Sequence, residues 1–447
     1  MKKILYLIAL LSIVSTYSYS TIYLVGSNQT YKKPSQVANL VKDGDTVNIQ
    51  PETWTDDVAT WSKSNLLIRG VNGMAILKAG TSNAGGKAIW VIQGSNVRVE
   101  NVDFSGCKVD DNNGAGIRYE GKKFFAKNCS FHHNEMGILT INDPETEIYF
   151  ESCEFYENGY GDGYSHNIYI GRCKLFEMKY CYSHQAKIGH CVKSRASENY
   201  IMYNRIMDLP DGTSSMLIDL PNGGKSFIIG NEMMEGPLSE NRNIIAYGME
   251  NDLHAVSFLC VINNTIISKR SVCSFIKGKY DSLNYYVVNN VFAGAGSIFD
   301  GISDNSADNY NTADLNATKL VNIDNYDYTP TKDSPFINKS VMISKIDGKS
   351  LIPTEEYVHP RSYKDRVNSN NADMGAHEFA EITGIDDNTI TEISKISNIK
   401  IYNYFGDLIA TPNDYYTLKL LSNQLENGLY IVTYYEDSNF KSIKLLK

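Results

Sequence analysis

The sequence predicts an all-β fold made of stacked coils, because one short unit recurs along much of its length. In this unit a Cys or Asn is usually followed, two residues later, by a bulky apolar residue. Successive units are 27, 24, 28, 23, 27, 33 and 26 residues apart, as expected for turns of variable length on one coil. Short β-type runs such as 167–170 and 226–229 lie between the units, with almost no helical periodicity. The units begin at Val102, Cys129, Cys153, Cys181, Asn204, Asn231, Asn264 and Asn290.

The repeated Cys and Asn positions indicate what the inside of the coils contains. In a stack of β coils each strand pairs with its equivalent one turn away, so like residues lie above one another about 4.8 Å apart. We therefore expect a buried ladder in which the thiols of Cys129, Cys153 and Cys181 are followed by asparagine amides. We also expect these thiols to be free, although cysteines outside the cytoplasm often form disulfides. The asparagines of the ladder are Asn204, Asn231, Asn264 and Asn290.

Composition excludes some classes of protein. The chain of 447 residues has 42% hydrophobic and 21% charged residues, enough apolar material for a large core. A formal charge of -9 argues against a nucleic-acid partner, since phosphate contacts need a basic face. The 31 tyrosines favour β structure and ring surfaces of the kind that bind sugars or partner proteins.

The first twenty residues, 1–20, predict a secretory signal peptide. Lys2 and Lys3 precede a mostly apolar run from Ile4 to Val14, and a small, polar stretch ends at Ser20. The apolar run has about 11 residues, whereas a membrane-spanning helix needs roughly 20. No later stretch is long and apolar enough to span a bilayer, so we expect a secreted protein without a transmembrane segment.

The N-terminal part of the predicted mature chain carries a resemblance to a known family. Residues 34–41 could form a short amphipathic helix, and 43–47 and 51–54 could lead into a first coil. This arrangement resembles secreted right-handed parallel β-helix proteins of the pectate-lyase-like kind, in which a helix caps the solenoid. A cap is required because an open end exposes core residues and unpaired strand edges. The resemblance covers roughly residues 21–300 and implies a right-handed parallel β-helix solenoid with an N-terminal capping helix.

Two later segments, 333–338 and 372–378, resemble the paired "SPAID" and "DIGAYE" signatures that close many secreted bacterial β-helix proteins. The resemblance implies that the solenoid, residues 21–380, is closed near Phe379. His377 and Glu378 lie in the second segment, but one His beside one carboxylate is a weak sign of a metal site. We expect these two residues to have a structural role.

The end of the chain predicts a separate module, 399–447, after a linker at 381–398. Residues 399–403, a turn at Gly406, residues 425–432 and a basic segment at 441–447 follow in that order. The pattern resembles the C-terminal sorting domain of type IX secretion cargo in Bacteroidetes. It implies a small β-sandwich-like module, the secretion machinery as a partner, and release from the cell or retention at the outer-membrane surface. The alternative is an ordinary terminal β-sandwich fragment.

Polar residues concentrate in three consecutive coils. The number of residues between each of these strands and the next ladder position shows which residues lie above one another. Tyr169, Lys193 and Asp219 lie 12, 11 and 12 residues before the next Cys or Asn of the ladder. If a turn absorbs the one-residue difference, the three stack in one column, about 5 Å apart. Strand alternation then turns their side chains outward and directs residues 168, 192 and 218 into the core.

Further polar residues are expected beside this column. Arg195 follows Lys193 by two residues on the same face, and His166 and His190 fall at matching positions 24 residues apart. The stretch Pro221–Gly224 predicts a tight turn. The residues expected to contact a substrate are His166, Asn222 and Tyr247.

An outward cluster of Lys, Arg, His and Tyr suits β-elimination of a uronic-acid polysaccharide. A carboxylate must be neutralised so that the neighbouring proton becomes acidic, a base must take the proton, and an acid must protonate the leaving oxygen. We assign Lys193 or His190 as the base, Arg195 as the neutralising group, and Tyr169 as the acid or a second base. Asp219 opposes a base role for Lys193, since a neighbouring carboxylate keeps a lysine charged.

Residues 193–204 resemble the "KS…N…N" coil of chondroitinase-B-like and alginate lyases, in which the lysine is the proposed base. Of the functional residues of those families, only the lysine has a counterpart in this chain, Lys193. The next coil of those families presents an arginine, whereas this chain has Ile218-Asp219-Leu220-Pro221. Their calcium-binding carboxylates are missing from 186–192, so calcium is unsupported, and we predict no cofactor and no metal.

Two alternatives to a lyase stay open. Lys193 and Asp219 could form only a cross-rung ion pair, on a non-catalytic carbohydrate-binding protein or adhesin. A glycoside hydrolase would need paired carboxylates, and the nearest partners of Asp219 are Glu250 and Asp252, beyond the next strand. The sequence thus predicts a secreted β-helix protein that binds an acidic polysaccharide, and leaves open whether it is an enzyme.

Overall fold

The computed structural model of the protein describes residues 20–303, 308–367 and 372–379, together with 396–403, 406, 408–413, 429–436 and 439–446. The chain forms two compact units, Met1–Glu378 and Phe379–Lys447. Apart from Ser20, the predicted signal peptide lies outside the described residues, as does most of the predicted linker. Within the described part of the chain, no helix is long and apolar enough to cross a membrane.

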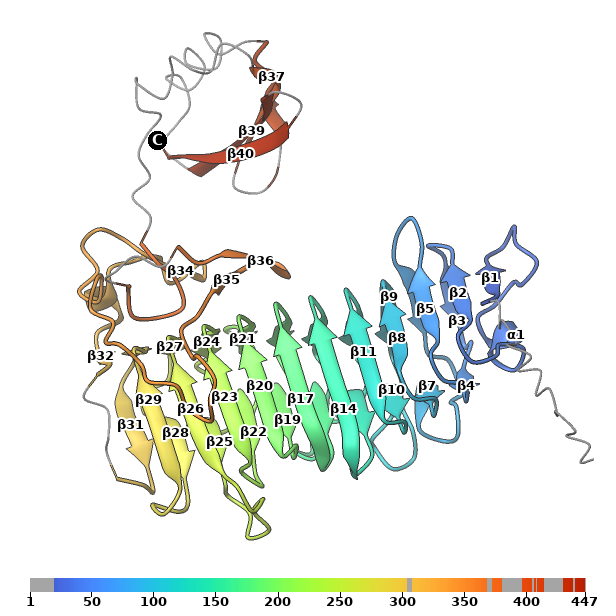
Figure 1. The fold of residues 1–447 in the computed structure, drawn as a ribbon, viewed down its shortest axis with the longest axis horizontal. Helices are drawn as coiled ribbons and strands as arrows, with labels where there is room; N and C mark the ends of the chain where they lie inside the picture. Colours follow the sequence, from blue (N-terminus) through green and yellow to red (C-terminus); the bar gives the residue numbers. More distant parts are fainter. Residues whose placement is uncertain are drawn as a thin grey trace, which may run out of the picture. The chain divides into compact units, whose positions relative to one another are not determined.

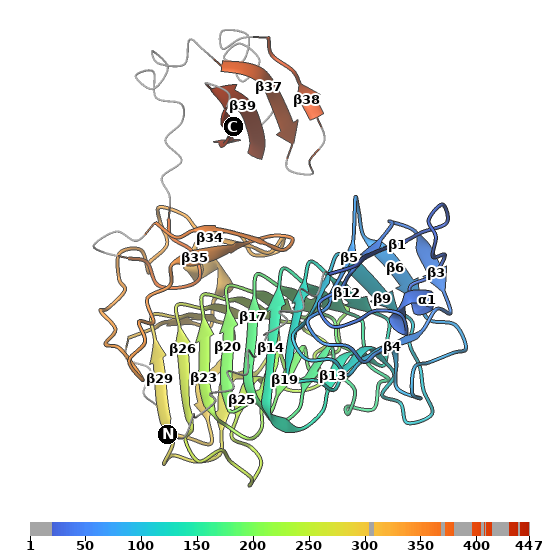
Figure 2. The same ribbon diagram turned by 45° about the vertical axis from the view of Figure 1, so that its right-hand side comes forward.

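Three parallel sheets form the first unit, and the chain passes through them in turn (Figure 1). Neighbouring strands within a sheet come from successive coils, as the turned view also shows (Figure 2). The predicted stack of β coils is therefore confirmed as a parallel β-helix. Aromatic side chains stack along its inside in the same way. The rings of Phe104, Phe131 and Phe155 follow one another at 5.2 and 4.9 Å and are almost parallel.

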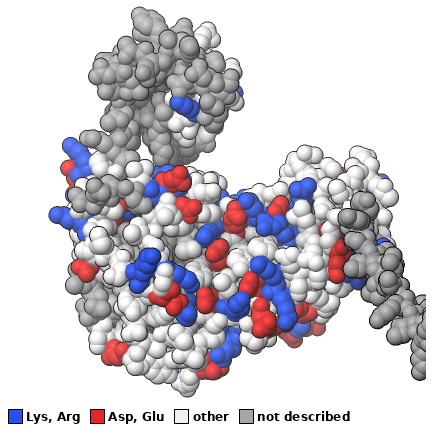
Figure 3. Space-filling model, viewed as in Figure 1, with Lys and Arg blue, Asp and Glu red and all other residues white. Residues whose placement is uncertain are grey.

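Sheet A has 11 strands and carries ion pairs on its outer face. Lys123 and Lys174 both contact Glu147, and Lys127 contacts Glu151 at 2.6 Å. Acidic and basic atoms are interspersed on the face shown in Figure 3. The strands are β1 (Ile22–Val25), β2 (Thr46–Ile49), β5 (Leu67–Gly70), β8 (Val97–Glu100), β11 (Lys123–Lys127), β14 (Asp143–Glu151), β17 (Cys173–Lys179), β20 (Glu198–Met202), β23 (Lys225–Ile229), β26 (Phe258–Ile262) and β29 (Asn284–Val288).

Sheet B also has 11 strands, and the Cys and Asn residues of the predicted ladder directly precede many of them. Its strands are β3 (Thr53–Thr55), β6 (Ala75–Lys78), β9 (Val102–Ser105), β12 (Ser130–His132), β15 (Glu154–Tyr156), β18 (Tyr182–His184), β21 (Arg205–Met207), β24 (Glu232–Glu235), β27 (Thr265–Ser268), β30 (Val291–Ala293) and β32 (Tyr310–Thr312).

Sheet C has 10 strands and contains the three coils that the sequence singles out as polar. Long loops, at residues 157–167, 208–217 and 248–257, lead into or out of its strands. Its strands are β4 (Ala59–Trp61), β7 (Ala88–Ile92), β10 (Ala115–Tyr119), β13 (Met136–Thr140), β16 (Ile168–Ile170), β19 (Val192–Ser194), β22 (Ile218–Leu220), β25 (Asn243–Tyr247), β28 (Cys273–Gly278) and β31 (Gly296–Asp300).

The buried ladder of thiols and amides is confirmed. Cys181 accepts a hydrogen bond from the backbone N–H of Cys153 at 3.3 Å, and its own N–H donates to Asn204 at 2.9 Å. Each following asparagine repeats the pattern, since the side-chain oxygen of Asn231 accepts from both the backbone and the side chain of Asn204. The eight cysteines are all buried and free, as expected, so hydrogen bonds rather than disulfides join these coils.

The N-terminal helix α1 (Ser35–Ala38) is one turn long, shorter than the predicted 34–41. Val37 and Ala38 are buried, and the helix packs against β4, the first strand of sheet C. Beyond the helix the chain turns, and the Asp45 carboxylate accepts a hydrogen bond from the N–H of Lys42 at 2.7 Å. The helix still covers the N-terminal end of the core, as a cap must.

The C-terminal segment, described at residues 315–367 and 372–378, returns along the outside of the solenoid. It contains η1 (Leu315–Thr318) and two antiparallel hairpins, β33 (Leu320–Asn322) with β34 (Asp327–Pro330) and β35 (Glu355–Val358) with β36 (Ser362–Asp365). Phe336 and Met374 pack on apolar side chains of sheet B, and Leu351 packs on sheet A. The two segments expected to close the solenoid meet, because the N–H of Met374 donates to the Phe336 carbonyl oxygen at 3.2 Å, and they cover apolar side chains of sheet B.

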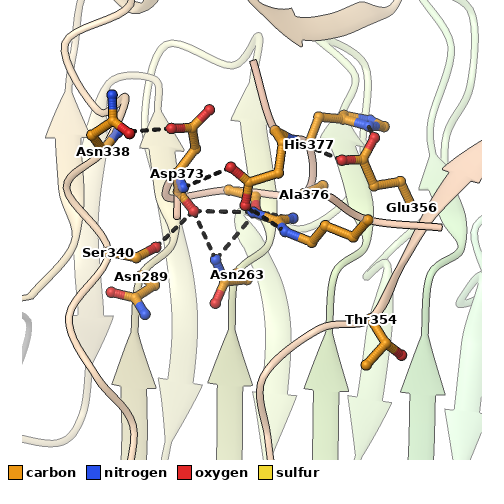
Figure 4. Close-up of polar contacts among 12 residues, drawn as sticks. Asn263, Asn289, Asn338, Ser340, Thr354, Glu356, Asp373, Ala376 and His377 are labelled. Atoms are coloured by element: carbon orange, nitrogen blue, oxygen red, sulfur yellow. Dashed lines mark hydrogen bonds and ion pairs between the residues drawn. The ribbon is translucent and has the colours of Figure 1, made fainter. Parts of the chain in front are cut away.

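Buried ionic contacts fix this segment, as Figure 4 shows. His377 lies between Glu232 of β24 and Glu356 of β35, and its Nδ1 is 3.1 Å from the Glu356 carboxylate. The Glu378 carboxylate accepts a hydrogen bond from the buried Arg366 side chain at 2.8 Å. In the described residues, both His377 and Glu378 thus have the structural role expected of them.

The second unit contains an antiparallel sheet in the order β38–β37–β39–β40. Ile399, Ile401 and Val432 are buried in it. Its strands are β37 (Ile396–Asn403), β38 (Leu408–Ala410), β39 (Leu429–Glu436) and β40 (Asn439–Leu446).

Candidate functional site

The column predicted from residue counting exists on sheet C. Tyr169 of β16 pairs with Lys193 of β19, and Lys193 pairs with Asp219 of β22. The neighbouring Ile168, Val192 and Ile218 are fully buried, as the alternation of a strand requires. The three polar side chains therefore point away from the core on adjacent rungs.

Asp219 is the least exposed member of the column and contacts two basic groups. Its side chain is 8% exposed, and one carboxylate oxygen lies 3.1 Å from Lys193 Nζ and 3.4 Å from His190 Nε2. The Lys193 side chain is 14% exposed. Lys193 is thus held as an ion-paired ammonium, and its remaining N–H groups are the part available to a ligand.

The two histidines stack, but neither directs a free nitrogen to solvent. The His166 and His190 rings lie 4.7 Å apart and almost parallel, and the backbone N–H of His190 donates to His166 Nδ1 at 3.0 Å. Burial lowers the pKa of His166 well below its usual value and the pKa of His190 to about 4. His190 Nδ1 is enclosed without a partner among the described residues. Both rings are therefore neutral at pH 7, and His190 is poorly placed to act on a bound polymer.

Arg195 forms the most extensive polar contacts of the site. Its guanidinium pairs with both carboxylate oxygens of Glu250, at 2.6 and 2.8 Å, and donates to Tyr169 Oη at 2.9 Å and to Asn222 Oδ1 at 2.7 Å. The hydrogen bonds from Arg195 lower the pKa of Glu250 and keep it ionised. Because a bidentate pair of this kind is the geometry in which arginine recognises any carboxylate, Glu250 occupies a carboxylate-binding position.

A cleft of about 280 Å³ lies over these residues on the outer face of sheet C. Met136 and Leu139 give it an apolar floor beside Tyr169, and loop residues form its other wall. Tyr164 on that wall is 82% exposed, so its ring is available to a ligand. The residues that line the cleft are Asp111, Asn112, Asn113, Met136, Leu139, Asp162, Tyr164, His166, Tyr169, Lys193 and Arg195.

The structure corrects one expected substrate contact and restricts two others. Tyr247 is fully buried and its hydroxyl donates to the Gly224 carbonyl oxygen at 2.6 Å, so it cannot face a ligand. The reason is register, because Asp219 pairs with Ala246 and the next residue turns inward. Asn222 is 2% exposed and holds Arg195, while the buried His166 reaches only the edge of the cleft.

Several cleft residues were missed because they lie on loops. Asp111, Asn112, Asp162 and Tyr164 precede the strands β10 and β16 without any periodic pattern. Gly161 and Gly163, both with a positive φ, flank Asp162 and are the one sequence signal of a sharp loop there.

A second groove of about 280 Å³ lies on sheet A, lined in part by Phe125, Tyr149 and Tyr363. Its lysines are matched by carboxylates, since Lys127 contacts Glu151 at 2.6 Å and Lys179 approaches Glu177 at 3.8 Å. The basic side chains of both places are paired with carboxylates, since Lys193 and Arg195 of the sheet C cleft contact Asp219 and Glu250.

The described residues contain no group of three or more His, Cys, Asp or Glu side chains arranged to hold a metal ion. Around Lys193, the carboxylates of Asp219, Glu250 and Asp252 all contact basic side chains instead.

A family match and the structure of pectate lyase Pel9A agree with this architecture. Residues 64–232 match the family described as "Right handed beta helix region". The crystal structure of pectate lyase Pel9A is similar, with a TM-score of 0.57 and 16% identity over 81% of this chain and 97% of that chain. Pectin methylesterase PemA from Erwinia chrysanthemi gives a TM-score of 0.36 and 12% identity over 70% of this chain and 99% of that chain. No curated protein matches the sequence.

These findings define the fold of the first unit. It is a right-handed parallel β-helix, as the sequence predicts. Function is a separate question, because one fold carries many activities.

Proposed function

We propose that the first unit binds an acidic, uronic-acid polysaccharide in the cleft over sheet C. One observation carries the proposal: Lys193 and Arg195 meet two tyrosine rings in a cleft with an apolar floor. The cations would bind the carboxylates of the polymer, and the rings of Tyr164 and Tyr169 would pack against the apolar faces of its sugars. The fold of Pel9A, a pectate lyase, supports the proposal at the level of architecture.

Arg195 would recognise the carboxylate by exchange. Glu250 is 46% exposed and lies on a loop, so it can leave the guanidinium when a uronate arrives. Tyr169 and Asn222 would keep the guanidinium in place during the exchange, since both contact it on other sides. Lys193 would then contact the neighbouring sugar, because it lies two residues before Arg195 on the same coil.

Elimination is a second candidate, favoured by the contact between Arg195 and Tyr169. A uronate held by Arg195 has its charge neutralised, which makes its C5 proton acidic. A base would take that proton, the bond from C4 to the leaving oxygen would break, and a double bond would form between C4 and C5. Tyr169 accepts a hydrogen bond from Arg195, so its own proton is free to be donated to the leaving oxygen. Lys193 is the candidate base, and its pairing with Asp219 is the main argument for binding without cleavage.

The sequence features at the two ends of the chain support a location outside the cell. A signal peptide at 1–20 would direct export, and the module at 399–447 would be read by type IX secretion machinery. The four-stranded antiparallel sheet of the second unit supports a separately folded module. The protein would then be released or retained at the outer-membrane surface.

A panel of polymers tests both candidates. Alginate, pectate, chondroitin sulfate and polyglucuronate would be tested for binding by affinity electrophoresis, and for elimination by the ultraviolet absorbance of an unsaturated product. Arg195→Ala and Lys193→Ala should lose at least tenfold in affinity. Lys277→Ala is the matched control, because Lys277 lies outward on sheet C and pairs with Asp300 at 2.9 Å.

The two measurements separate the candidates. Binding without any rise in absorbance would support a carbohydrate-binding protein and overturn the lyase. A rise that Lys193→Ala abolishes would support elimination. Equal binding by the wild type and both site variants would refute the site itself.

A further inference from the structure

The groove of about 280 Å³ on the outer face of sheet A, called here the sheet A groove, lies beside a pair of stacked tyrosines. Tyr363 of β36 stacks on Tyr180, with ring centroids 4.1 Å apart and planes 20° apart. Tyr180 is itself buried, and its hydroxyl donates to Glu355 of β35 at 2.6 Å. One face of the Tyr363 ring is thus covered by a fixed neighbour. Because Tyr363 is still 48% exposed and lines the groove, its other face is open there.

Two further rings line the sheet A groove but have no open face of this kind. Phe125 and Tyr149 stack on neighbouring rungs, 4.7 Å apart. Arg98, on the rung before, lies over the Phe125 ring at 4.8 Å and pairs with Glu100 at 3.3 Å. These rings form an apolar part of the groove, and Tyr363 is the ring on which a ligand can stack.

The other charged residues of the sheet A groove alternate in sign along the solenoid. Lys127, Glu151 and Lys179 pair in register on the successive strands β11, β14 and β17. Lys127 contacts Glu151 at 2.6 Å, and Lys179 lies 3.8 Å from Glu177. Each of these lysines therefore has a carboxylate beside it, and a ligand in the groove meets both signs of charge.

This arrangement favours an uncharged ligand over an acidic one. Glu151 and Glu177 belong to the strands β14 and β17 themselves, so they cannot move aside as Glu250 can on its loop. A uronate in the groove would be repelled by these carboxylates. The hydroxyl groups of a neutral sugar, in contrast, can donate to a carboxylate and accept from an ammonium. Lys127 and Glu151 are both half-exposed, so each can still bind such a hydroxyl.

We propose that the sheet A groove is a second glycan-binding site, for an uncharged polysaccharide. The open face of Tyr363 would pack against the apolar face of one sugar, and the pair of Lys127 and Glu151 would bind sugar hydroxyls beside it. The volume lies just below the range of about 300 to 1,000 Å³ that is usual for small-molecule sites, so the groove would hold a short stretch of a chain. The site is separate from the cleft of sheet C and does not depend on the proposed function.

Affinity electrophoresis of the full-length mature protein tests the site, in gels that contain arabinoxylan, galactomannan, xyloglucan or mixed-linkage β-glucan. At least one of these uncharged polymers should retard the wild type. Tyr363→Ala should weaken that binding at least tenfold, whereas Tyr363→Phe, which keeps the ring, should bind as the wild type does. Tyr286→Ala is the matched control, because Tyr286 lies outward on the same sheet and is 37% exposed but does not line the groove.

A second measurement tests the preference for an uncharged polymer. The polymer that binds would be carboxymethylated, which adds carboxylates to its hydroxyl groups. The protein for this comparison would carry Arg195→Ala, so that the cleft of sheet C does not contribute. Carboxymethylation should weaken binding at least tenfold.

Circular dichroism would first confirm that each variant is folded. Binding that fails in Tyr363→Ala and survives in Tyr363→Phe and Tyr286→Ala would establish the site. The absence of binding to all four polymers, binding unchanged in Tyr363→Ala, or an equal loss in Tyr286→Ala would overturn it. Equal affinity for the carboxymethylated polymer would overturn the preference for uncharged sugars.

Discussion

Replacing His377 by Gln should make the stability of the first unit lose part of its dependence on pH. His377 lies in the C-terminal segment, fully enclosed between the carboxylates of Glu232 and Glu356. Glu232 belongs to the solenoid, where it also pairs with Arg205. The imidazolium is therefore a link between this segment and the coils beneath it.

The magnitude follows from the pKa of His377. Burial opposes its charge, but the hydrogen bonds to Glu232 and Glu356 prevail and raise its pKa from 6.5 to about 9. This difference corresponds to about 3 kcal/mol of unfolding free energy, which agrees with the cost of removing one partner from a buried ion pair. Because the folded pKa is raised, the contribution is complete below pH 6.5 and disappears as the pH rises through 9.

Urea unfolding of the full-length protein, followed by circular dichroism between pH 6 and 10, measures the effect. At pH 6 the wild type should exceed His377→Gln by about 3 kcal/mol, and above pH 9 the two should converge. Glu235, whose pKa burial raises to about 8, also reduces stability over part of this range, but it does so equally in both proteins.

His190→Gln is the control, because burial lowers the pKa of His190 to about 4 and its ring is neutral throughout this range. Its difference from the wild type should not change with pH. A constant difference between the wild type and His377→Gln from pH 6 to 10 would refute the charged link.

Three more predictions follow from the described contacts. Asn231→Ala should destabilise the protein by about 3 to 5 kcal/mol in urea unfolding, because it removes the acceptor of two Asn204 donors in the buried ladder; a loss below 1 kcal/mol would contradict this. Thiol reagents should leave all eight cysteines unmodified in the native protein and modify all of them in denaturant, whereas rapid native labelling would contradict their burial. Glu250→Gln should strengthen polymer binding by up to about fivefold, since it removes the exposed competitor of Arg195, and weaker binding would contradict the exchange.

The repeat made the solenoid and its main column predictable. Cys153 and Asn231 occupy equivalent positions on different coils, so residue counting reveals the ladder without any structure. The same counting from the ladder places Tyr169, Lys193 and Asp219 on adjacent rungs, and the strand pairing confirms it. A period is a property of the backbone, and a sequence records it directly.

The rest of the site depends on features that have no period. Ala246 pairs with Asp219 and so continues the outward column on the next rung, which turns Tyr247 inward. The expected substrate contact of Tyr247 is wrong because it did not take this register into account. Tyr164 reaches the cleft from a loop of irregular length, and Glu250 reaches Arg195 from the loop after β25. The C-terminal segment covers the sheets through Phe336 and Leu351, which lie in short apolar stretches without a repeating period.

The most direct test of the account is the affinity of the wild type for one uronic-acid polymer before and after chemical reduction of its carboxyl groups. The reduced polymer keeps the sugar backbone but offers no carboxylate to Arg195 and Lys193. The account predicts that reduction weakens binding at least tenfold, and that Arg195→Ala removes this preference. Equal affinity for both polymers, or a preference that persists in Arg195→Ala, would contradict the claim that the cleft on sheet C recognises carboxylates.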